Sequence, residues 1–276
     1  MRIAVAGKGG AGKTTISATI ARLTARAGRR VIAIDADANP NLAVALGFDP
    51  QIAACLRPIP PVLVSRRLGG PGLTTSMDQV LADFALPGPD GLHLLGMGAP
   101  EHANEGCLCS AHAVVSAVLE DLAREPESVV VVDMEASPEH LSRGTIRHAD
   151  VVCLVAEPYY RSLETVRRMA ALATELPVAR VVVIANKLRS PDDAEAVAEF
   201  CDRHGLPLVG RVPWGDGVAA ADRARAAVVD CPGTEEVVEA IAETCTTIGA
   251  TTPGDQRACR PQSAVKSCRL SGDGAR

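Results

Sequence analysis

The chain has 276 residues and a formal net charge of −5, a size that suits one α/β domain with a large core or two small domains. The acidic balance gives no indication of non-specific nucleic-acid binding, and no apolar run reaches the roughly eighteen residues that a membrane span needs. Strand-like sequence begins at Arg2, which leaves no room for a signal peptide. We therefore expect a cytoplasmic protein, in which the nine scattered cysteines form no disulfide framework.

The first element is the most informative. Ile3–Ala6 is apolar and predicts a buried strand, and the run Gly7-Lys8-Gly9-Gly10-Ala11-Gly12-Lys13-Thr14-Thr15 fits the phosphate-loop pattern G-x-x-x-x-G-K-[ST]. A helix predicted over Thr14–Ala27 completes the required strand–loop–helix order. In such a loop Lys13 reaches the β- and γ-phosphates and the Thr14 hydroxyl binds Mg²⁺. The residues expected to hold the nucleotide here are Gly9, Gly10, Ala11, Gly12, Lys13, Thr14 and Thr15.

Two later strands each end in an acidic residue. Val31–Asp35 is the second predicted strand, and Val129–Asp133 has the Walker B form of four β-branched residues followed by an acid. Because the carboxyl ends of parallel strands meet at one edge of a sheet, both carboxylates should lie near the phosphate loop. We expect Asp35 and Asp133 to contribute to the hydrated Mg²⁺ shell. The alternative for Asp35 and the residues after it is an Asp/Asn/Pro turn that caps a helix.

The rest of the chain alternates strands with helices, which predicts a single doubly wound, mostly parallel sheet with helices on both faces. The remaining strands are expected at His93–Leu95, Val151–Ala156, Val181–Asn186 and Leu208–Val212. Further helices are expected at Ala113–Arg124, Leu163–Leu176, Asp192–His204 and Glu235–Ile248. Arg57–Gly72 is interpreted as an irregular surface insert. Residues 1–249 would form the domain, and residues 250–276 a disordered tail.

Cys107 and Cys109 form a C-x-C pair, whereas most of the isolated cysteines are expected to be buried. One pair supplies too few thiolates for a closed tetrahedral site, but a two-fold axis doubles them to four, which suits Ni²⁺, Zn²⁺ or an iron–sulfur cluster. The alternative is two ordinary cysteines at a helix start. Nearby, His112 could contribute a ligand, although a solvated helix residue is the favoured interpretation, and the same holds for Glu101, His102 and Glu105.

With Lys8 included, the phosphate loop resembles that of a particular ATPase family. The string K-G-G-x-G-K-T-T, with this early lysine, is similar to the deviant Walker A ATPases, which include partition and division-site ATPases and the nitrogenase iron protein. The resemblance implies a homodimer that sandwiches ATP, with Lys8 crossing to the partner's nucleotide. It also implies that Asp37 positions the attacking water, so Lys8, Lys13 and Asp37 are the catalytic candidates. By the same resemblance Asn186 hydrogen-bonds adenine and the Pro213 segment lines the base.

Three further strings narrow the resemblance. Asp-Ala-Asp-x-Asn-x-Asn-Leu from Asp35, Gly-Cys-x-Cys from Gly106, and Asp-Met-Glu-Ala-x-x-Glu-His-Leu-x-Arg-Gly-Thr from Asp133 look like the CooC-type ATPases, which deliver nickel to carbon monoxide dehydrogenase. The resemblance covers about residues 1–245 and implies a dimer that binds one nickel through the paired cysteines. Two residues depart from the family pattern: Ser137 stands where switch II usually has glycine, and Ala38 where proline is common.

Two other functions remain open. A ParA/MinD-like positioning ATPase typically needs a basic DNA-binding face or a basic amphipathic C-terminal helix, whereas the last predicted helix carries Glu235, Glu236, Glu239 and Glu243. An iron–sulfur electron-transfer ATPase like the nitrogenase iron protein takes its two ligands per subunit from separate loops, whereas here both thiols share one loop. The favoured hypothesis is a metallochaperone ATPase with a metalloenzyme client, no nucleic-acid partner and no membrane span.

Overall fold

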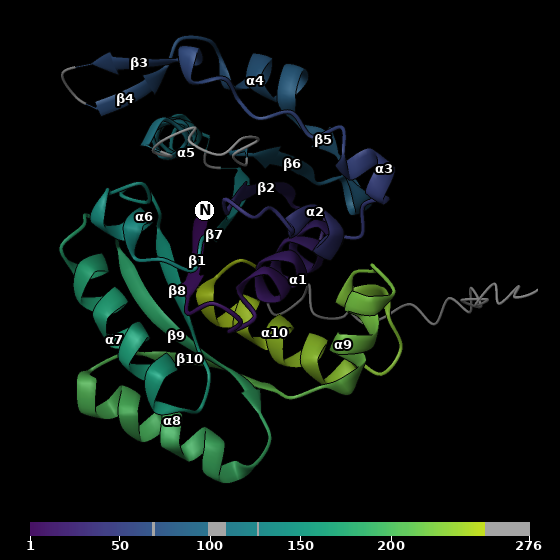
Figure 1. Ribbon diagram of the computed structural model, residues 1–276, viewed down its shortest axis with the longest axis vertical. Helices are drawn as coiled ribbons and strands as arrows, with labels where there is room; N and C mark the ends of the chain where they lie inside the picture. The colour runs from purple at the N-terminus through teal and green to yellow at the C-terminus, as the bar shows by residue number, and fades with distance from the viewer. Residues whose placement is uncertain (68–69, 99–108, 126, 252–276) are drawn as a thin grey trace, which may run out of the picture.

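The computed structural model describes residues 1–67, 70–98, 109–125 and 127–251. Its main sheet has eight strands in the order β10-β9-β8-β1-β7-β2-β6-β5, and all neighbours are parallel except the short edge pair β5–β6 (Figure 1). The strands are β1 Arg2–Gly7, β2 Arg30–Ala36, β5 Leu86–Pro87, β6 His93–Gly96, β7 Ser128–Met134, β8 Val151–Ala156, β9 Arg180–Leu188 and β10 Leu208–Pro213. The doubly wound, mostly parallel sheet is therefore confirmed.

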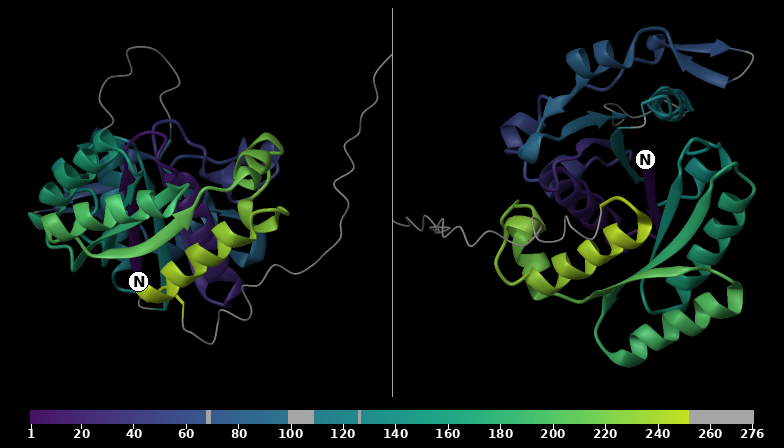
Figure 2. Two further views of the ribbon diagram at one scale, coloured as in Figure 1. Left: turned by 90° about the horizontal axis from the view of Figure 1, so that it is seen from below. Right: turned by 180° about the vertical axis from the view of Figure 1, so that it is seen from behind.

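Helices cover both faces of this sheet (Figures 1 and 2). The longer ones are α1 Lys13–Arg26, α5 Cys109–Leu122, α7 Tyr160–Thr174, α8 Pro191–His204 and α10 Glu235–Ile248. The shorter ones are α2 Leu42–Ala45, α3 Pro50–Ala53, α4 Met77–Phe84, α6 Glu139–Ser142 and α9 Asp216–Arg223, with 3₁₀ turns η1 Pro61–Leu63, η2 Pro89–Gly91 and η3 Val228–Asp230. Local signals set several ends: Ser190 caps α8 by accepting from the Asp193 N–H, and Gly205 ends the helix with a positive φ.

The two faces of the sheet bury separate apolar cores. Side chains alternate along each strand, so Ile3 and Val5 of β1 pack with α1 and α10, whereas Ala4 and Ala6 pack toward α5, α7 and α8. The central strands β7 and β8 are buried at every position. This two-sided burial explains why these strands are continuous apolar runs rather than alternating ones.

The predicted irregular insert is wrong in part. Within it, β3 Val64–Arg67 and β4 Gly70–Leu73 pair as an antiparallel hairpin, and β4 lies against α5. The Gly-Pro-Gly of β4 has the composition of a loop, but backbone pairing does not require side chains of high β propensity. At the other end of the domain, Ala250 and Thr251 are buried, so the folded part extends past residue 249, and the remainder of the predicted tail lies outside the described residues.

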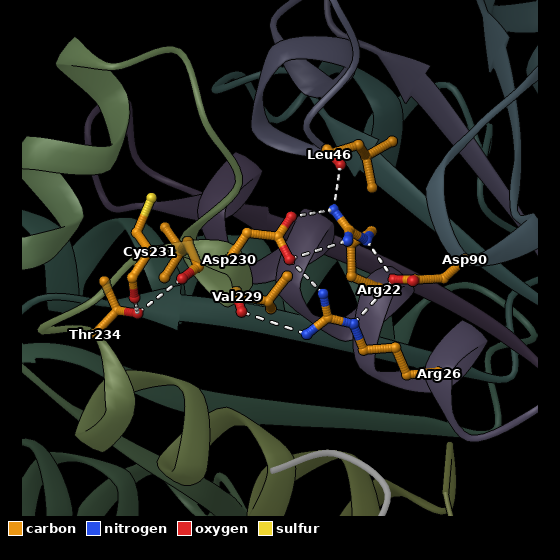
Figure 3. A network of polar contacts seen from close by, with 9 residues as sticks. Arg22, Arg26, Leu46, Asp90, Val229, Asp230, Cys231 and Thr234 are labelled. Atoms are coloured by element: carbon orange, nitrogen blue, oxygen red, sulfur yellow. Dashed lines mark hydrogen bonds and ion pairs between the residues drawn. The ribbon is translucent and has the colours of Figure 1, made fainter. Parts of the chain in front are cut away.

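A partly buried ion-pair network connects the last turns of α1 to the rest of that face (Figure 3). The Arg22 guanidinium contacts Asp90 at 2.6 Å and Asp230 at 2.9 Å, and it donates to the Leu46 carbonyl oxygen at 2.7 Å. Arg26 contacts the same two carboxylates. One end of α1 is thereby fixed to η2, η3 and the residue after α2, while its other end begins at the phosphate loop.

Three of the five isolated cysteines that the structure describes are buried, as expected for most of them. Cys153, Cys201 and Cys245 are buried, whereas Cys231 is half-buried and Cys55 is exposed after α3. No helix in the described ranges combines the length and apolarity that a bilayer crossing requires.

Candidate functional site

The predicted phosphate loop connects β1 directly to α1. Within it the Ala11 N–H donates to the Lys8 carbonyl oxygen at 3.1 Å, and Gly10 and Gly12 adopt positive φ angles of 81° and 96°. Gly12 precedes the first turn of α1, and no side chain caps that turn. The loop therefore leaves the amino end of the helix open toward a phosphate, as nucleotide binding requires.

Gly12 is needed for a second reason, which is the close approach of Asn186. The Asn186 amide nitrogen donates to the Ala11 carbonyl oxygen at 2.7 Å, and a Cβ at position 12 would collide with it. Asn186 ends the buried part of β9, so it connects that strand to the loop. The structure thus brings this predicted adenine-binding residue to the nucleotide loop, where its amide N–H already bonds the backbone.

Beside the phosphate loop lies a group of polar side chains, Glu157, Tyr159 and Lys187, that the sequence analysis did not predict to be part of the site. The Lys187 ammonium donates to the Gly10 carbonyl oxygen and lies 3.0 Å from the Glu157 carboxylate, which also accepts from the Tyr159 hydroxyl at 2.6 Å. The Lys8 ammonium lies 5.8 Å from the centre of the Tyr159 ring, within cation–π range. Glu157 follows β8 and Lys187 is the penultimate residue of β9, so both lie at the carboxyl ends of neighbouring parallel strands, a position that could have drawn attention to them.

Asp133 lies at the centre of the predicted metal site. Its carboxylate accepts from the Thr14 hydroxyl at 2.6 Å and from the Ser17 hydroxyl at 3.0 Å. Burial raises the pKa of Asp133 to about 7, although the Thr14 hydrogen bond opposes that shift. Thr14 and Asp133 are therefore placed as a Mg²⁺ pair would be, and Ser17 joins them without having been predicted.

Lys13 lies beside this pair. Its side chain is almost fully buried, with 6% of the residue exposed. Burial lowers the pKa of the ammonium, and the carboxylates of Asp133, Asp37 and Glu135 oppose that change. A desolvated cation near three carboxylates is suited to meet the negative charge of a nucleotide phosphate.

Asp35 has a more structural environment than the Mg²⁺ shell expected for it. One carboxylate oxygen accepts from the Leu42 N–H at 2.9 Å and the other from the Asp37 N–H at 3.2 Å. Burial raises its pKa to about 6 against these hydrogen bonds. Asp35 therefore holds the loop that leads into α2, although Asn41, the cap residue of that helix, makes no side-chain capping hydrogen bond; the Mg²⁺ role of Asp35 stays a prediction. Asp37 is half-buried and accepts from the Asn39 N–H at 2.8 Å, in an Asx turn.

Pro213 ends β10 opposite Leu188 of β9. The next residue, Trp214, lies under the Arg189 guanidinium, which is 3.7 Å from the ring centre, and its indole N–H donates to Asp216 at 2.8 Å. The Trp214 backbone N–H donates to the Leu188 carbonyl oxygen at 2.7 Å, which places the ring beside the end of the strand that carries Asn186. The single tryptophan of the chain is thus positioned as a spectroscopic reporter of this region.

The predicted cysteine site can be placed only in part. Cys107 lies outside the described residues, and Cys109 is the first residue of α5, with its side chain not described. The expectation that His112 is solvated is wrong: only 3% of the residue is exposed, and its Nδ1 lies 3.3 Å from the Nδ1 of His140. That contact joins α5 to the segment after Asp133.

Comparison with known proteins defines the class. The model of the CobQ/CobB/MinD/ParA nucleotide-binding domain matches residues 3–227, and the chain belongs to this family. Among solved structures, the MinD cell division protein of Aquifex aeolicus is similar with a TM-score of 0.67 at 21% identity, covering 90% of this chain and 95% of that one. The Pyrococcus horikoshii septum site-determining protein MinD complexed with Mg-ADP has a TM-score of 0.65 at 18% identity, with the same coverage.

The CooC-type resemblance within this family is confirmed. The chain is 38% identical to the carbon monoxide dehydrogenase accessory protein CooC of Rhodospirillum rubrum over 233 residues, which are 81% of this chain and 88% of the relative. It is also 35% identical to an ATP-binding protein of Methanocaldococcus jannaschii over 228 residues, 80% of this chain and 88% of that one.

Proposed function

We propose that this chain is an ATP-hydrolysing metallochaperone. As a homodimer it binds one nickel ion through Cys107 and Cys109 of both subunits and delivers it to carbon monoxide dehydrogenase or a related metalloenzyme. The observation that carries this proposal is the 38% identity to the accessory protein CooC, together with the C-x-C pair of this chain. Zn²⁺ is the alternative metal for the same thiolate set.

The nucleotide half of the proposal rests on the loop and its acidic partners. Thr14 and Asp133, whose side-chain oxygens are 2.6 Å apart, would hold Mg²⁺, Thr14 directly and Asp133 through water, and the ion would supply positive charge to the nucleotide phosphates. Lys13 neutralises phosphate charge from within the same subunit, and Lys8 does so across the dimer. Asp37 orients the attacking water. Among these groups, Asp35 acts indirectly, because its hydrogen bonds fix the segment that carries Asp37.

The metal half rests on where α5 begins and what it touches. The helix starts at Cys109 and contacts the segment after Asp133 through His112. That segment, residues 134–142, follows the Walker B strand and is the part of the chain that responds to loss of the γ-phosphate in a P-loop ATPase. ATP binding would order it, close the dimer and complete the four-thiolate site, and hydrolysis would release the metal.

The direct test is nickel stoichiometry against oligomeric state. Anaerobic protein is loaded with Ni²⁺, with and without a non-hydrolysable ATP analogue, beside a Cys107→Ala/Cys109→Ala variant. We expect one thiolate-bound nickel per dimer in the wild-type protein with nucleotide, seen as a thiolate-to-nickel charge-transfer band, and loss of that band and of that one nickel per dimer in the variant. An unchanged nickel content and dimer in both proteins would exclude the metallochaperone function and favour a positioning ATPase. Visible absorbance of the unloaded protein would instead indicate an iron–sulfur cluster.

Mg²⁺ binding is expected to depend on pH through Asp133. A carboxylic acid whose pKa is raised to about 7 is protonated below that pH, and the proton competes with the metal. The Mg²⁺ affinity of the ADP complex should therefore fall by up to tenfold per pH unit below about 7 and level off above it. Titration of Mg²⁺ between pH 8 and pH 6, followed by Trp214 fluorescence, measures this.

The nucleotide also takes up protons in this range, so Asp133→Asn is the matched control. The amide cannot titrate, and this variant should bind Mg²⁺ more weakly with only the pH dependence of the nucleotide. An identical pH profile in both proteins would show that Asp133 does not carry the effect.

A further inference from the structure

Two buried histidines face each other outside the nucleotide site. His112 comes from the first turn of α5 and His140 from α6, and they expose 3% and 0% of their residues. Their rings are nearly perpendicular with centroids 4.3 Å apart, and their Nδ1 atoms are 3.3 Å apart. Burying two imidazoles is costly unless their ring nitrogens have a defined use, so the pair calls for a chemical explanation.

A carboxylate completes the group. Glu135 is half-buried, and one ligand atom from each of His112, Glu135 and His140 lies within 4.8 Å of the others. Two imidazoles and one carboxylate are a common donor set for Zn²⁺ and related first-row cations, with a fourth position left open. The Thr145 hydroxyl oxygen also lies 3.4 Å from the His112 Nδ1, so it is a polar neighbour of this group.

The spacing of the two nitrogens fits a metal. Nitrogens bound tetrahedrally at about 2.05 Å from one ion are separated by roughly 3.3 Å, which follows from the tetrahedral angle. The observed separation is 3.3 Å, so both rings can ligate without moving apart. Which Nδ1 donates in this contact depends on the tautomers of the two rings. A metal needs both Nδ1 atoms unprotonated, so on binding the proton of this contact must move to an Nε2 atom, which is buried in both rings, or leave the pair.

A cavity beside the two histidines provides an entry path for a metal ion. A cavity of about 200 Å³ opens onto His112 and is lined by Ser116 and Thr145, with Arg143 and Arg147 also on its wall. Both arginines are exposed, so solvent screens their charge, whereas the Glu135 carboxylate lies at the ligands themselves.

We propose that His112, Glu135 and His140 form a divalent-metal site inside each subunit, suited to Ni²⁺ or Zn²⁺ and separate from the C-x-C pair. The site is built from one chain and needs no dimer. It holds nitrogen and oxygen donors where the C-x-C pair offers sulfur, so the two sites bind a borderline cation with different strength. A cation that leaves the thiolates therefore has a second set of ligands in the same subunit.

The site also connects metal to nucleotide. Glu135 is two residues after Asp133, whose carboxylate contacts Thr14 of the phosphate loop, while His112 is three residues after Cys109 on α5. Three helical residues rise by about 4.5 Å, so His112 is less than one turn from Cys109. A metal bound by Glu135, His140 and His112 would clamp α5 against the segment that follows Asp133. Occupancy and nucleotide state should then influence each other.

The test removes the thiolates first. Full-length Cys107→Ala/Cys109→Ala protein is titrated anaerobically with Co²⁺ and then Ni²⁺, by calorimetry and by visible absorbance. We expect one metal per chain, with Co²⁺ d–d bands and no thiolate-to-metal charge-transfer band. Adding Glu135→Gln or His140→Gln to this background should weaken binding at least about tenfold. His204→Gln, which removes an exposed histidine at the end of α8, should leave binding unchanged.

Folding is controlled separately. Each variant must keep the thermal midpoint of its background within a few degrees in the absence of metal, and Glu135→Gln is the decisive variant because this side chain is only half-buried. No stoichiometric binding in the thiolate-free protein, or binding that both Glu135→Gln and His140→Gln leave intact, would overturn the proposal and mark the histidine contact as packing alone.

The metal-binding experiment gives different results when the inner metal site is absent and when the proposed C-x-C function is wrong. If the thiolate-free protein binds no metal while the wild-type dimer holds one nickel, the C-x-C function stands and the inner site is absent. If the thiolate-free protein binds one metal per chain while the wild-type dimer interface holds none, the inner site stands and the C-x-C function is excluded.

Discussion

Lys13→Ala is expected to reduce kcat for ATP hydrolysis by at least about 100-fold, the loss typical of removing one preorganised charge from a transferring phosphoryl group. The lysine is 6% exposed and lies among the carboxylates of Asp133, Asp37 and Glu135, so an alanine leaves negative charge facing the phosphates. Phosphate release at saturating Mg-ATP measures the effect.

Lys8→Ala should cause a comparable loss for a different reason, and mixing the two variants separates them. If Lys8 serves the partner's nucleotide, a mixed dimer has one site with both lysines intact and one site with neither. Equal mixing makes about half of all dimers mixed, so about one quarter of wild-type activity should return. If Lys8 acts within its own subunit, where it now lies 5.8 Å from the Tyr159 ring, mixing restores nothing.

Arg168→Ala is the matched control for these two variants. This exposed cation pairs with Glu164 on α7, so its removal deletes a positive charge without touching the loop. Activity should stay within about twofold of wild type, since exposed pairs contribute little. A similar loss in all three variants would point to a general effect of charge and contradict the role of Lys13.

The sheet could be predicted because its strands carry their own signal. Val129–Val132 and Val151–Val155 are buried on both faces of the sheet, so each strand has a continuous apolar run that can be recognised in the sequence. The antiparallel edge strand β5 has two residues, one of them a proline, and gives no such signal. The hairpin β3–β4 was missed for the related reason that its stability comes from pairing and from α5 rather than from its own composition.

In the candidate site, too, some features could be predicted from the sequence and others could not. The phosphate loop is one contiguous string, so its chemistry could be assigned residue by residue. Asn186 is 175 residues from the Ala11 carbonyl that it bonds, and only the family resemblance, not the periodicity, placed it at the nucleotide. The His112–His140 contact spans 28 residues and depends on how α5 packs beside the end of β7. A histidine within a helix pattern reads equally well as solvated or buried, since its polarity fits either position.

Arg22→Met is expected to lower the free energy of unfolding by about 3 kcal/mol, near the lower limit for breaking a buried ion pair. The Arg22 side chain is 4% exposed and connects Asp90, Asp230 and the Leu46 carbonyl oxygen, so its loss removes the bond to Leu46 and leaves the two carboxylates with Arg26 alone (Figure 3). Methionine preserves most of the volume of the stem, which confines the change to the guanidinium. Urea unfolding measures the free energy, and thermal unfolding should show a midpoint lower by roughly 6–12 °C.

Arg26→Met is the comparison that tests this reasoning. It contacts the same two carboxylates, but 21% of its side chain is exposed, so water replaces part of what it provides, and the cost should be about 1 kcal/mol. Nucleotide affinity below the unfolding range should be unchanged in both variants, because Arg22 is nine helical residues, about 13 Å, from Lys13. Equal destabilisation by the two substitutions would show that burial does not decide the strength of this network.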